Sequence, residues 1–266
     1  MTDTHTITRD GVNLHVETAG PANGPTIMFS NSLGSTLHLW DQVLPHLPVG
    51  LRIIRYDMRG HGKSDVPPGP YSMGALVADA EAICDALAVK DALFVGLSVG
   101  GMVAQGLAVK RLDLIRALVL SNTAAKIGTP KLWQDRIDMI QTHGMAAMAQ
   151  SVMPRWFGRD FYGTPAMQPW QEMLAGVDPV GYTGVCAAIA GTDFYTPTSG
   201  LRLPCLGITG SEDKSTPPDL VRETIELIPG SDFQIMRRLG HLPCVEDPAG
   251  YAAPLNGFIE RTGHLT

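Results

Sequence analysis

Cysteine is scarce in this chain, and its placement does not match a metal or disulfide motif. The 266 residues include four cysteines, at Cys84, Cys186, Cys205 and Cys244. No two of them have the C-x-x-C spacing of a zinc or redox motif. We therefore expect neither a disulfide framework nor a metal site, and a reducing, cytoplasmic compartment is the simplest interpretation.

The chain also lacks an excess of positive charge and a recognisable targeting segment. Lys and Arg number 20 against 26 Asp and Glu, which leaves a net charge of −6 and no basic surface for nucleic acid or an anionic membrane. The first residues have neither the basic region nor the apolar core of a signal peptide. We expect no nucleic-acid or membrane partner. Nothing in the sequence indicates an oligomeric state.

Long uninterrupted apolar runs are missing as well. Residues 92–109 carry no charge and approach the length of a membrane span, but glycine, serine and glutamine interrupt them. A buried strand followed by a buried helix explains this stretch better than a span does. With 44% hydrophobic and 17% charged residues, the whole chain has the composition of a packed globular protein.

The patterns that are present predict an α/β fold with a mostly parallel sheet. Alternating residues over Thr4–Arg9 and Val12–Ala19, joined by Asp10-Gly11, predict an N-terminal hairpin. Short apolar strands then alternate with helical patterns, so helices should cover both faces of the sheet. The expected strands are Thr26–Phe29, Arg52–Tyr56, Leu93–Val95, Ala117–Leu120, Cys205–Thr209 and Phe233–Met236, and the helical patterns include Leu37–Leu47, Met73–Leu87 and Leu220–Ile228.

The alternation fails between about residues 124 and 200. This stretch has helical patterns broken by proline and glycine, and it contains no convincing strand. We interpret it as a helical lid inserted between two parts of one core, residues 1–123 and 201–266. Reactive groups in such sheets lie at the carboxyl ends of the strands, so the lid should cover that edge.

The sequence Gly96-Leu97-Ser98-Val99-Gly100 carries the clearest chemical signal. An apolar strand precedes it and a helical pattern follows it. A serine on such an abrupt turn adopts a strained backbone, which lifts its hydroxyl clear of the sheet. The next backbone N–H groups then lie at a helix N-terminus, where an oxyanion would form. Ser98 is therefore the candidate nucleophile; the alternative is a glycine-rich turn with a capping serine.

A serine hydroxyl needs a base, and the eight histidines offer several candidates. Most lie in the predicted hairpin, in predicted helices or, as His264 does, in a tail expected to fray. His61 and His241 lie in loops after strands. The order nucleophile, acid, base favours His241, which directly follows the last strand. For His61 we expect a turn residue that shapes the floor of the site.

The acid should lie in a loop after a strand between Ser98 and His241. Residues 121–124 offer no carboxylate, whereas Glu212 and Asp213 follow the next strand. Asp213 is preferred as the group that orients the imidazole, because the shorter carboxylate commonly fills this role. Glu212 is expected to point to solvent.

An oxyanion hole also needs a second backbone donor from the loop after Thr26–Phe29. The small residues of 30–35 let the chain turn tightly there, and we predict Leu33 N–H as the donor that pairs with Val99 N–H. Asn31 and Ser32 could add side-chain bonds to the site or stabilise the turn itself.

Together these residues resemble the α/β-hydrolase family over nearly the whole chain outside the lid. The resemblance rests on Gly96–Gly101, Asp57–Ser64, Gly210–Pro217 and Gly240-His241. Many relatives have His-Gly where this chain has Asn31-Ser32. That variation is similar to the 3-oxoadipate enol-lactonases, as are residues 121–129 and Arg155-Trp156-Phe157.

The closer resemblance implies a carboxylic ester hydrolase of aromatic-compound catabolism, acting after protocatechuate or catechol cleavage. Its substrate would be a small five-membered enol lactone with an acetate side chain, opened to 3-oxoadipate through an acyl-serine. It implies no metal and no organic cofactor. The alternatives are another small-molecule esterase or C–C hydrolase of this fold, or a non-catalytic ligand-binding protein.

An anionic substrate of this kind requires a cation or strong donor in the pocket. Thr129 and Pro130 predict the start of a lid helix on which Arg136 falls within an apolar face. One hypothesis is that Arg136 binds the substrate carboxylate beside Trp133; the other is a structural ion pair with Glu172 or Asp160. Further candidates for the carboxylate are Arg155 and Lys126.

Overall fold

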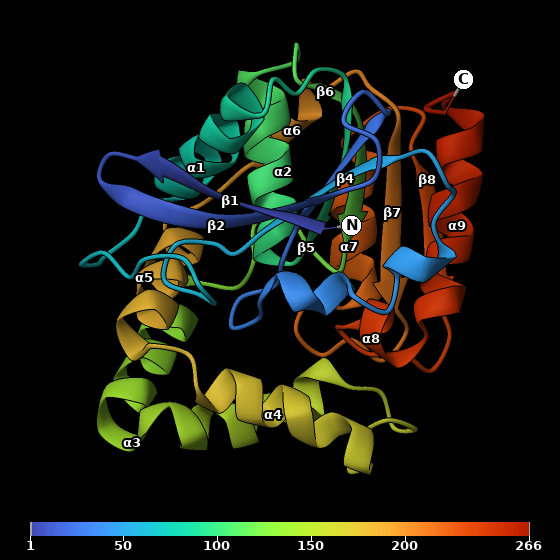
Figure 1. The fold of residues 1–266 in the computed structure, drawn as a ribbon. Coiled ribbons are helices and arrows are strands. Elements are labelled where there is room, and N and C mark those ends of the chain that lie inside the picture. The colour runs from blue at the N-terminus through green and yellow to red at the C-terminus, as the bar shows by residue number, and fades with distance from the viewer. Residues whose placement is uncertain (1, 266) are drawn as a thin grey trace.

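An eight-stranded sheet forms the centre of the computed structural model, which describes residues 2–265 (Figure 1). Its strand order is β1-β2-β4-β3-β5-β6-β7-β8. β1 and β2 run antiparallel to their neighbours, and the remaining pairs are parallel, as the sequence predicts. The strands are β1 (Thr2–Arg9), β2 (Val12–Ala19), β3 (Thr26–Ser30), β4 (Arg52–Tyr56), β5 (Ala92–Leu97), β6 (Ile115–Ser121), β7 (Cys205–Gly210) and β8 (Asp232–Met236).

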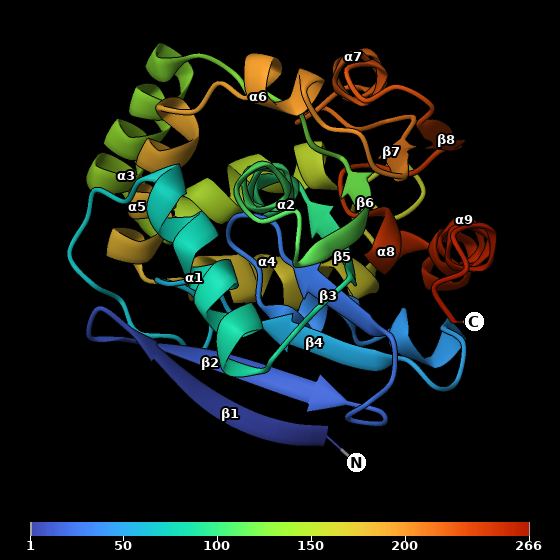
Figure 2. The same ribbon diagram turned by 90° about the horizontal axis from the view of Figure 1, so that it is seen from above.

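Helices cover both faces of this sheet, which explains why its central strands read as continuous apolar runs. Every residue of β3, β5 and β7 is buried. In the view from above, α1, α2 and α7 lie on one face and α9 on the other (Figure 2). These helices are α1 (Met73–Ala86), α2 (Val99–Lys110), α7 (Pro218–Glu226) and α9 (Pro248–Arg261), with the short α8 (Pro243–Glu246) before α9.

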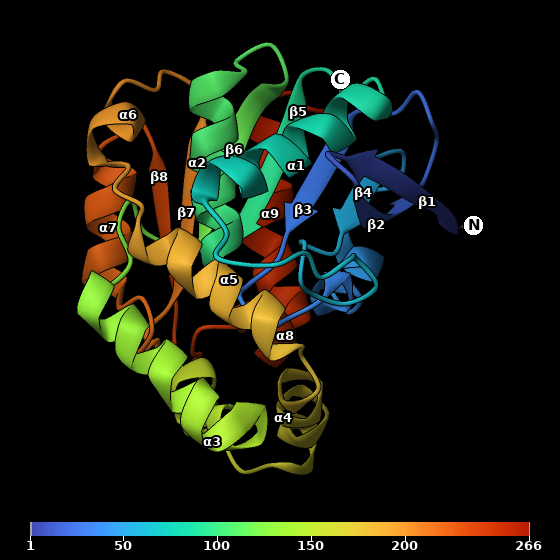
Figure 3. The same ribbon diagram turned by 90° about the vertical axis from the view of Figure 1, so that its left-hand side faces the viewer.

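The segment between β6 and β7 is helical, as expected for the lid. It contains α3 (Pro130–Trp156), η3 (Pro165–Met167), α4 (Gln168–Ala175), α5 (Pro179–Ala190) and α6 (Tyr195–Ser199). Figure 3 shows α3, α4 and α5 gathered below the sheet, whereas α6 lies beside α2. Gly144 has non-helical dihedral angles (φ 77°, ψ 174°) and divides α3 into two arms, residues 130–143 and 145–156.

Two local predictions are wrong. Leu37–Leu47 forms two short 3-10 turns, η1 (Leu37–Trp40) and η2 (Leu44–His46), instead of one helix. Pro45 lies inside this stretch and removes a backbone donor that a continuous helix would need. His264 is buried rather than frayed, and its ring Nε2–H donates to the Thr26 carbonyl at 2.9 Å.

Neither a single spanning helix nor a metal cluster occurs among residues 2–265. No one helix there is long and apolar enough to cross a bilayer; Pro165–Ala175 and Pro179–Ala190 reach that length only as a pair bent by 91°. The uncharged stretch at 92–109 is β5 followed by α2, as the sequence predicts. No group of three or more His, Cys, Asp or Glu side chains in this part of the chain could hold a metal ion.

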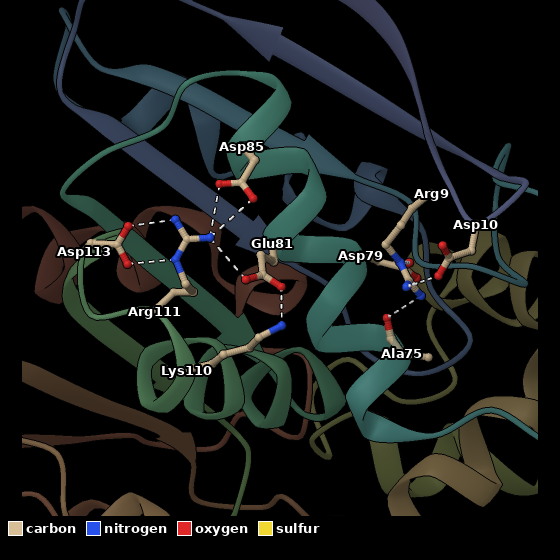
Figure 4. A network of polar contacts seen from close by, with 9 residues as sticks. All are labelled: Arg9, Asp10, Ala75, Asp79, Glu81, Asp85, Lys110, Arg111 and Asp113. Atoms are coloured by element: carbon tan, nitrogen blue, oxygen red, sulfur yellow. Dashed lines mark hydrogen bonds and ion pairs between the residues drawn. The ribbon is translucent and has the colours of Figure 1, made fainter.

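A polar network along α1 has a buried half around Asp79 and an exposed half around Arg111. Figure 4 draws both halves apart from Arg59. In the buried half, the Asp79 carboxylate binds Arg9 Nε at 2.7 Å and Arg59 Nε and Nη2 at 2.5 and 2.6 Å. Asp79 thereby ties α1 to β1 and to the loop after β4. In the exposed half, Arg111 binds three carboxylates, those of Glu81, Asp85 and Asp113.

Candidate active site

Ser98 lies on an abrupt turn between the end of β5 and the start of α2. Its dihedral angles (φ 59°, ψ −120°) are strained for a residue with a side chain, which confirms the predicted geometry of the turn. The Ser98 N–H donates to Ser121 O at 3.0 Å, and Thr123 Oγ1 donates to Ser98 O at 2.6 Å. A Cβ at Gly100 would overlap the Ser30 carbonyl, so glycine is required beside the turn. The neighbouring strands thus hold Ser98 in place.

His241 follows β8 and shares a cavity with Ser98. Its ring is buried, and Nδ1 lies 2.8 Å from Asp213 Oδ2. Because an ionised carboxylate only accepts, Nδ1 carries the proton and Nε2 is left with a lone pair. The backbone N–H of His241 donates to the Trp156 carbonyl at 2.7 Å, which fixes the loop against the lid. This arrangement is the one a general base requires.

Asp213 is buried, yet it is held in its ionised form. Burial opposes ionisation, but electrostatic attraction to the His241 ring and hydrogen bonds from His241, Asn122 and the Thr216 backbone outweigh it, and the pKa of Asp213 is lowered. The backbone N–H groups of Ser215 and Thr216 donate to Oδ1 at 2.7 and 3.0 Å. Thr216 Oγ1 adds a bond to Oδ2 at 2.8 Å. A charged carboxylate therefore faces the imidazole.

Asn122 is a site residue that the sequence analysis missed. It follows β6 with a φ of 45°, and its Nδ2 donates to Asp213 Oδ2 at 2.9 Å and to Gly240 O at 3.2 Å. The sequence signal for Asn122 was its position directly after a strand. The sequence analysis considered that loop, residues 121–124, only as a source of a carboxylate.

The prediction for Glu212 is wrong. Its side chain does not point to solvent, because Oε1 accepts from Arg159 Nε of the lid at 2.5 Å.

The predicted oxyanion donors both border the candidate site. Leu33 lines the same cavity as Ser98. Val99 is the first residue of α2, so its N–H has no acceptor within the helix. No hydrogen bond from Leu33 N–H is found among residues 2–265.

The Asn31 side chain does not contribute to the oxyanion hole. It is fully buried, its Nδ2 donates to Tyr56 O, and its Oδ1 accepts from Trp40 Nε1, both at 2.7 Å. Its side chain stabilises the turn.

The cavity between core and lid has about 490 Å³ of space free of protein atoms, counting its opening. The core contributes Ser98, His241 and the oxyanion turn, and the lid contributes aromatic and cationic side chains. The lid residues that line it include Trp133, Arg136, Arg155, Trp156 and Tyr182.

Arg136 and Arg155 are the only Lys, Arg, Asp or Glu side chains of the described residues that line this cavity. Arg136 lies over the Trp133 ring at 4.8 Å and reaches Tyr182 Oη only at 3.5 Å. Arg155 donates to the Lys214 carbonyl at 3.1 Å, while its buried Nε has no partner. Burial, followed by the charge of Arg136, lowers the pKa of Arg155. Two guanidinium groups thus meet beside the cavity without a carboxylate.

The alternative role for Arg136, a structural ion pair in the lid, is wrong. Asp160 binds Arg238 at 2.8 Å, and Glu172 accepts from Gln168 at 2.8 Å. Lys126 is not brought to the cavity either. It is exposed and pairs with Asp193 at 3.0 Å, whereas its neighbour Ile127 lines the cavity.

Glu246 joins the loop of His241 to the end of the lid helix α3. Its Oε1 accepts from Gly240 N at 2.7 Å, and its Oε2 accepts from Gly158 N at 2.9 Å. Burial raises the pKa of Glu246 from its ordinary value of 4.5 to about 7, and these two bonds oppose the rise only in part. The carboxyl group therefore changes its charge near neutral pH in a place that contacts both the base loop and the lid.

This raised pKa predicts a pH-dependent difference in stability between the wild type and a Glu246→Gln variant. Between pH 4.5 and 7 the folded wild type binds more protons at Glu246 than the unfolded chain does. Its stability relative to Glu246→Gln should therefore fall as the pH rises through this window. Thermal unfolding of both proteins at matched pH values tests this, because other titrating groups cancel in the difference. A difference that grows with pH would contradict it.

Known proteins resemble this chain over nearly its whole length. The model of the "alpha/beta hydrolase fold" family matches residues 25–162. A 3-oxoadipate enol-lactonase of Acinetobacter baylyi is 32% identical over 96% of this chain and 96% of its own length. The enol-lactonase structure from Burkholderia xenovorans has a TM-score of 0.89 at 32% identity, over 97% of this chain and 100% of that one. A thermophilic esterase from Thermogutta terrifontis has a TM-score of 0.90 at 25% identity, over 98% and 99%.

Proposed function

Because this chain belongs to the α/β-hydrolase family, and its enol-lactonase relatives support hydrolysis of an ester bond, we propose that it is a 3-oxoadipate enol-lactonase. Under this proposal it opens a five-membered enol lactone that bears a carboxylate side chain. Ser98 acts as nucleophile, His241 as base and Asp213 as the acid that orients the imidazole. The reaction belongs to the catabolism of aromatic compounds.

The pair of guanidinium groups at Arg136 and Arg155 is the observation that carries the choice of substrate. Both side chains are half-buried; a positive charge partly withdrawn from water without a counter-ion is unfavourable, and two adjacent ones repel each other. An incoming carboxylate would relieve both effects and would accept charge-assisted hydrogen bonds. An esterase for neutral substrates has no need of such a pair beside its nucleophile. The site therefore favours a small anionic ester or lactone.

The first half of the reaction is acyl transfer to the enzyme. Ser98 Oγ attacks the lactone carbonyl while His241 Nε2 takes the hydroxyl proton. The N–H groups of Leu33 and Val99 stabilise the tetrahedral oxyanion. The carbon–oxygen bond of the ring then breaks and expels an enolate, a better leaving group than an alkoxide. The enolate stays attached to the acyl chain, so His241 returns its proton to that oxygen without loss of a product.

The second half is hydrolysis of the acyl-serine. His241 Nε2 takes a proton from water, and the resulting hydroxide attacks the same carbonyl through a second oxyanion. Collapse of this intermediate releases Ser98 Oγ, which recovers its proton from His241. The product enol becomes the ketone of 3-oxoadipate. One water is consumed, and no redox change or cofactor enters the balance.

The decisive assay compares the enol lactone with neutral esters. Turnover is followed as loss of the ultraviolet absorbance of 3-oxoadipate enol-lactone, and a panel of p-nitrophenyl esters serves as the comparison. We expect kcat/KM for the lactone to exceed that for every ester of the panel. Rapid ester turnover with an inert lactone would instead identify an esterase. A protein inert toward all of them, and not labelled by a fluorophosphonate, would be a binding protein.

Removal of either guanidinium should weaken binding of the anionic lactone. Arg136→Ala and Arg155→Ala are each expected to raise KM by about 10- to 100-fold, the equivalent of one lost charge-assisted hydrogen bond of roughly 1.5–3 kcal/mol. Steady-state kinetics with the lactone and with p-nitrophenyl acetate separate charge recognition from damage to the lid, because the neutral ester should keep its KM. Lys126→Ala is the matched control, since Lys126 lies outside the cavity. An unchanged KM in both arginine variants would exclude their role.

A further inference from the structure

The predicted oxyanion donor Leu33 lies in a tight turn of four residues, Ser32–Ser35. The Ser35 N–H donates to the Ser32 carbonyl at 3.1 Å, and Gly34 has a φ of 80°. These features match a type II turn, whose third position favours glycine. A Cβ at Gly34 would also overlap Leu174 of the lid. The turn therefore has one well-defined shape, pressed between core and lid.

Ser35 fixes the first peptide group of this turn. Its Oγ donates a second hydrogen bond to the Ser32 carbonyl, at 2.8 Å, and the side chain is fully buried. The Ser32 carbonyl and the Leu33 N–H belong to the same planar trans peptide group, so they point in opposite directions. Two hydrogen bonds on the carbonyl therefore fix the direction in which the Leu33 N–H points.

His61 fixes the second peptide group. The Gly34 N–H donates to His61 Nε2 at 3.0 Å, and the opposite ring nitrogen, Nδ1, faces the Arg59 carbonyl at 3.3 Å. Nε2 can accept only from a neutral ring, with the proton on Nδ1. Burial lowers the pKa of His61 to about 4, so the ring is neutral at physiological pH. Within residues 2–265 the histidines that form ion pairs are His15, His38 and His241, and His61 is not among them.

The loop that carries His61 is itself held firmly against the oxyanion turn. Arg59 is bound through two nitrogens to the buried Asp79 carboxylate. Asp57 Oδ1 accepts from Leu37 N at 2.8 Å, on the far side of the turn. This loop therefore holds the turn itself at Gly34, through His61, and the chain just after the turn at Leu37, through Asp57. None of these residues is needed for the triad itself.

From these contacts we propose that His61 and Ser35 are positioning residues that aim the Leu33 N–H at the oxyanion. This inference rests on the proposed hydrolytic function, in which Leu33 N–H is a donor. Neither side chain touches the substrate carboxylate or takes a proton in the reaction. Their effect is exerted on the transition state, because the oxyanion forms only there.

The proposal predicts a specific kinetic pattern for substitutions at His61. His61→Ala removes the acceptor of the Gly34 N–H and should lower kcat by about 10- to 100-fold, somewhat less than the loss of an oxyanion donor itself. KM should stay within about twofold, since ground-state binding does not use the oxyanion contact. His61→Gln places an amide oxygen near the position of Nε2 and should restore most of kcat. Added imidazole should partly rescue His61→Ala.

Ser35→Ala offers a gentler test with a matched control. It removes one hydroxyl and should lower kcat by about 3- to 10-fold without a change in KM, because the Ser35 N–H still holds the carbonyl. Ser64→Ala is the control. Its buried hydroxyl donates to Asp57 O at 2.6 Å in the loop of His61, but it does not contact the oxyanion turn. Ser64→Ala should lose similar stability and keep its kcat.

A transition-state analogue distinguishes positioning from general damage. A trifluoromethyl ketone that adds to Ser98 forms an oxyanion, so its affinity should fall in parallel with kcat in His61→Ala and Ser35→Ala. Loss of kcat equal to that of Ser64→Ala, or unchanged analogue affinity, would overturn the inference. p-Nitrophenyl acetate serves as substrate in these assays, so a failed lactone assay leaves the test intact. A wild type that hydrolyses neither substrate and resists fluorophosphonate would overturn the proposed function instead.

Discussion

Ser98→Ala should lower kcat by about 10⁴- to 10⁶-fold, the largest effect that we expect from any single substitution in this chain. Without Oγ the acyl-enzyme cannot form, and only binding and the oxyanion donors still act on the bound ester. The side chain is small and lies at a cavity, so the fold should survive the change. Steady-state kinetics with the enol lactone and with p-nitrophenyl acetate measure the loss.

Labelling with a fluorophosphonate probe gives an independent measure of the same residue. The folded wild type should be labelled at Ser98, and peptide mapping identifies the site. Ser231→Ala is a suitable control, because its hydroxyl donates to the Ile228 carbonyl at 2.6 Å and does not line the cavity that holds Ser98. That variant should be labelled like the wild type. Label retained in Ser98→Ala, or activity within tenfold of wild type, would contradict the assignment of the nucleophile.

Asp79→Ala should have the largest effect on stability, a loss of about 3–5 kcal/mol in the free energy of unfolding. Only 2% of the Asp79 side chain is exposed, and its removal leaves the guanidinium of Arg59, 9% exposed, without a counter-ion. A charge buried without its partner is far more unfavourable than the intact pair. Urea unfolding measures the change as a shift in the midpoint at constant slope.

The exposed half of the same network supplies the control. Asp85 also binds an arginine, but 55% of its side chain is exposed and Arg111 keeps two other carboxylates when it is removed. Asp85→Ala should therefore lower the free energy of unfolding by less than about 1 kcal/mol. Equal losses in Asp79→Ala and Asp85→Ala would show that burial does not decide the strength of these ion pairs.

The sheet and the order of its strands along the chain could be predicted because each feature depends on nearby residues. Apolar strands, the turn at Asp10-Gly11 and the glycines around Ser98 are local signals. His241 and Asp213 could be selected by chain order, because carboxyl ends of parallel strands meet at one edge. The structure brings these residues together, and their roles in catalysis stay predictions that the assays above test.

The contacts that sequence reasoning missed are those set by packing between distant segments. Asn122 reaches Asp213 across 91 positions of the chain, and His264 reaches Thr26 across 238. The directions of the Arg136 and Lys126 side chains also depend on packing between distant segments. Both are cations in the lid, but only the fold decides that Arg136 faces the cavity and Lys126 faces Asp193. Charge and periodicity alone do not contain that information.

The position of the lid between β6 and β7 has a consequence for how this protein can diversify. These strands are neighbours in the sheet, and the residues proposed for catalysis lie outside the intervening stretch. The lid, which we propose to select the substrate, is thus one contiguous block of the gene, and two recombination junctions suffice to exchange it. The exchange has one structural condition. The backbone of His241 donates to the Trp156 carbonyl, so a transplanted lid must bring its own acceptor to that position.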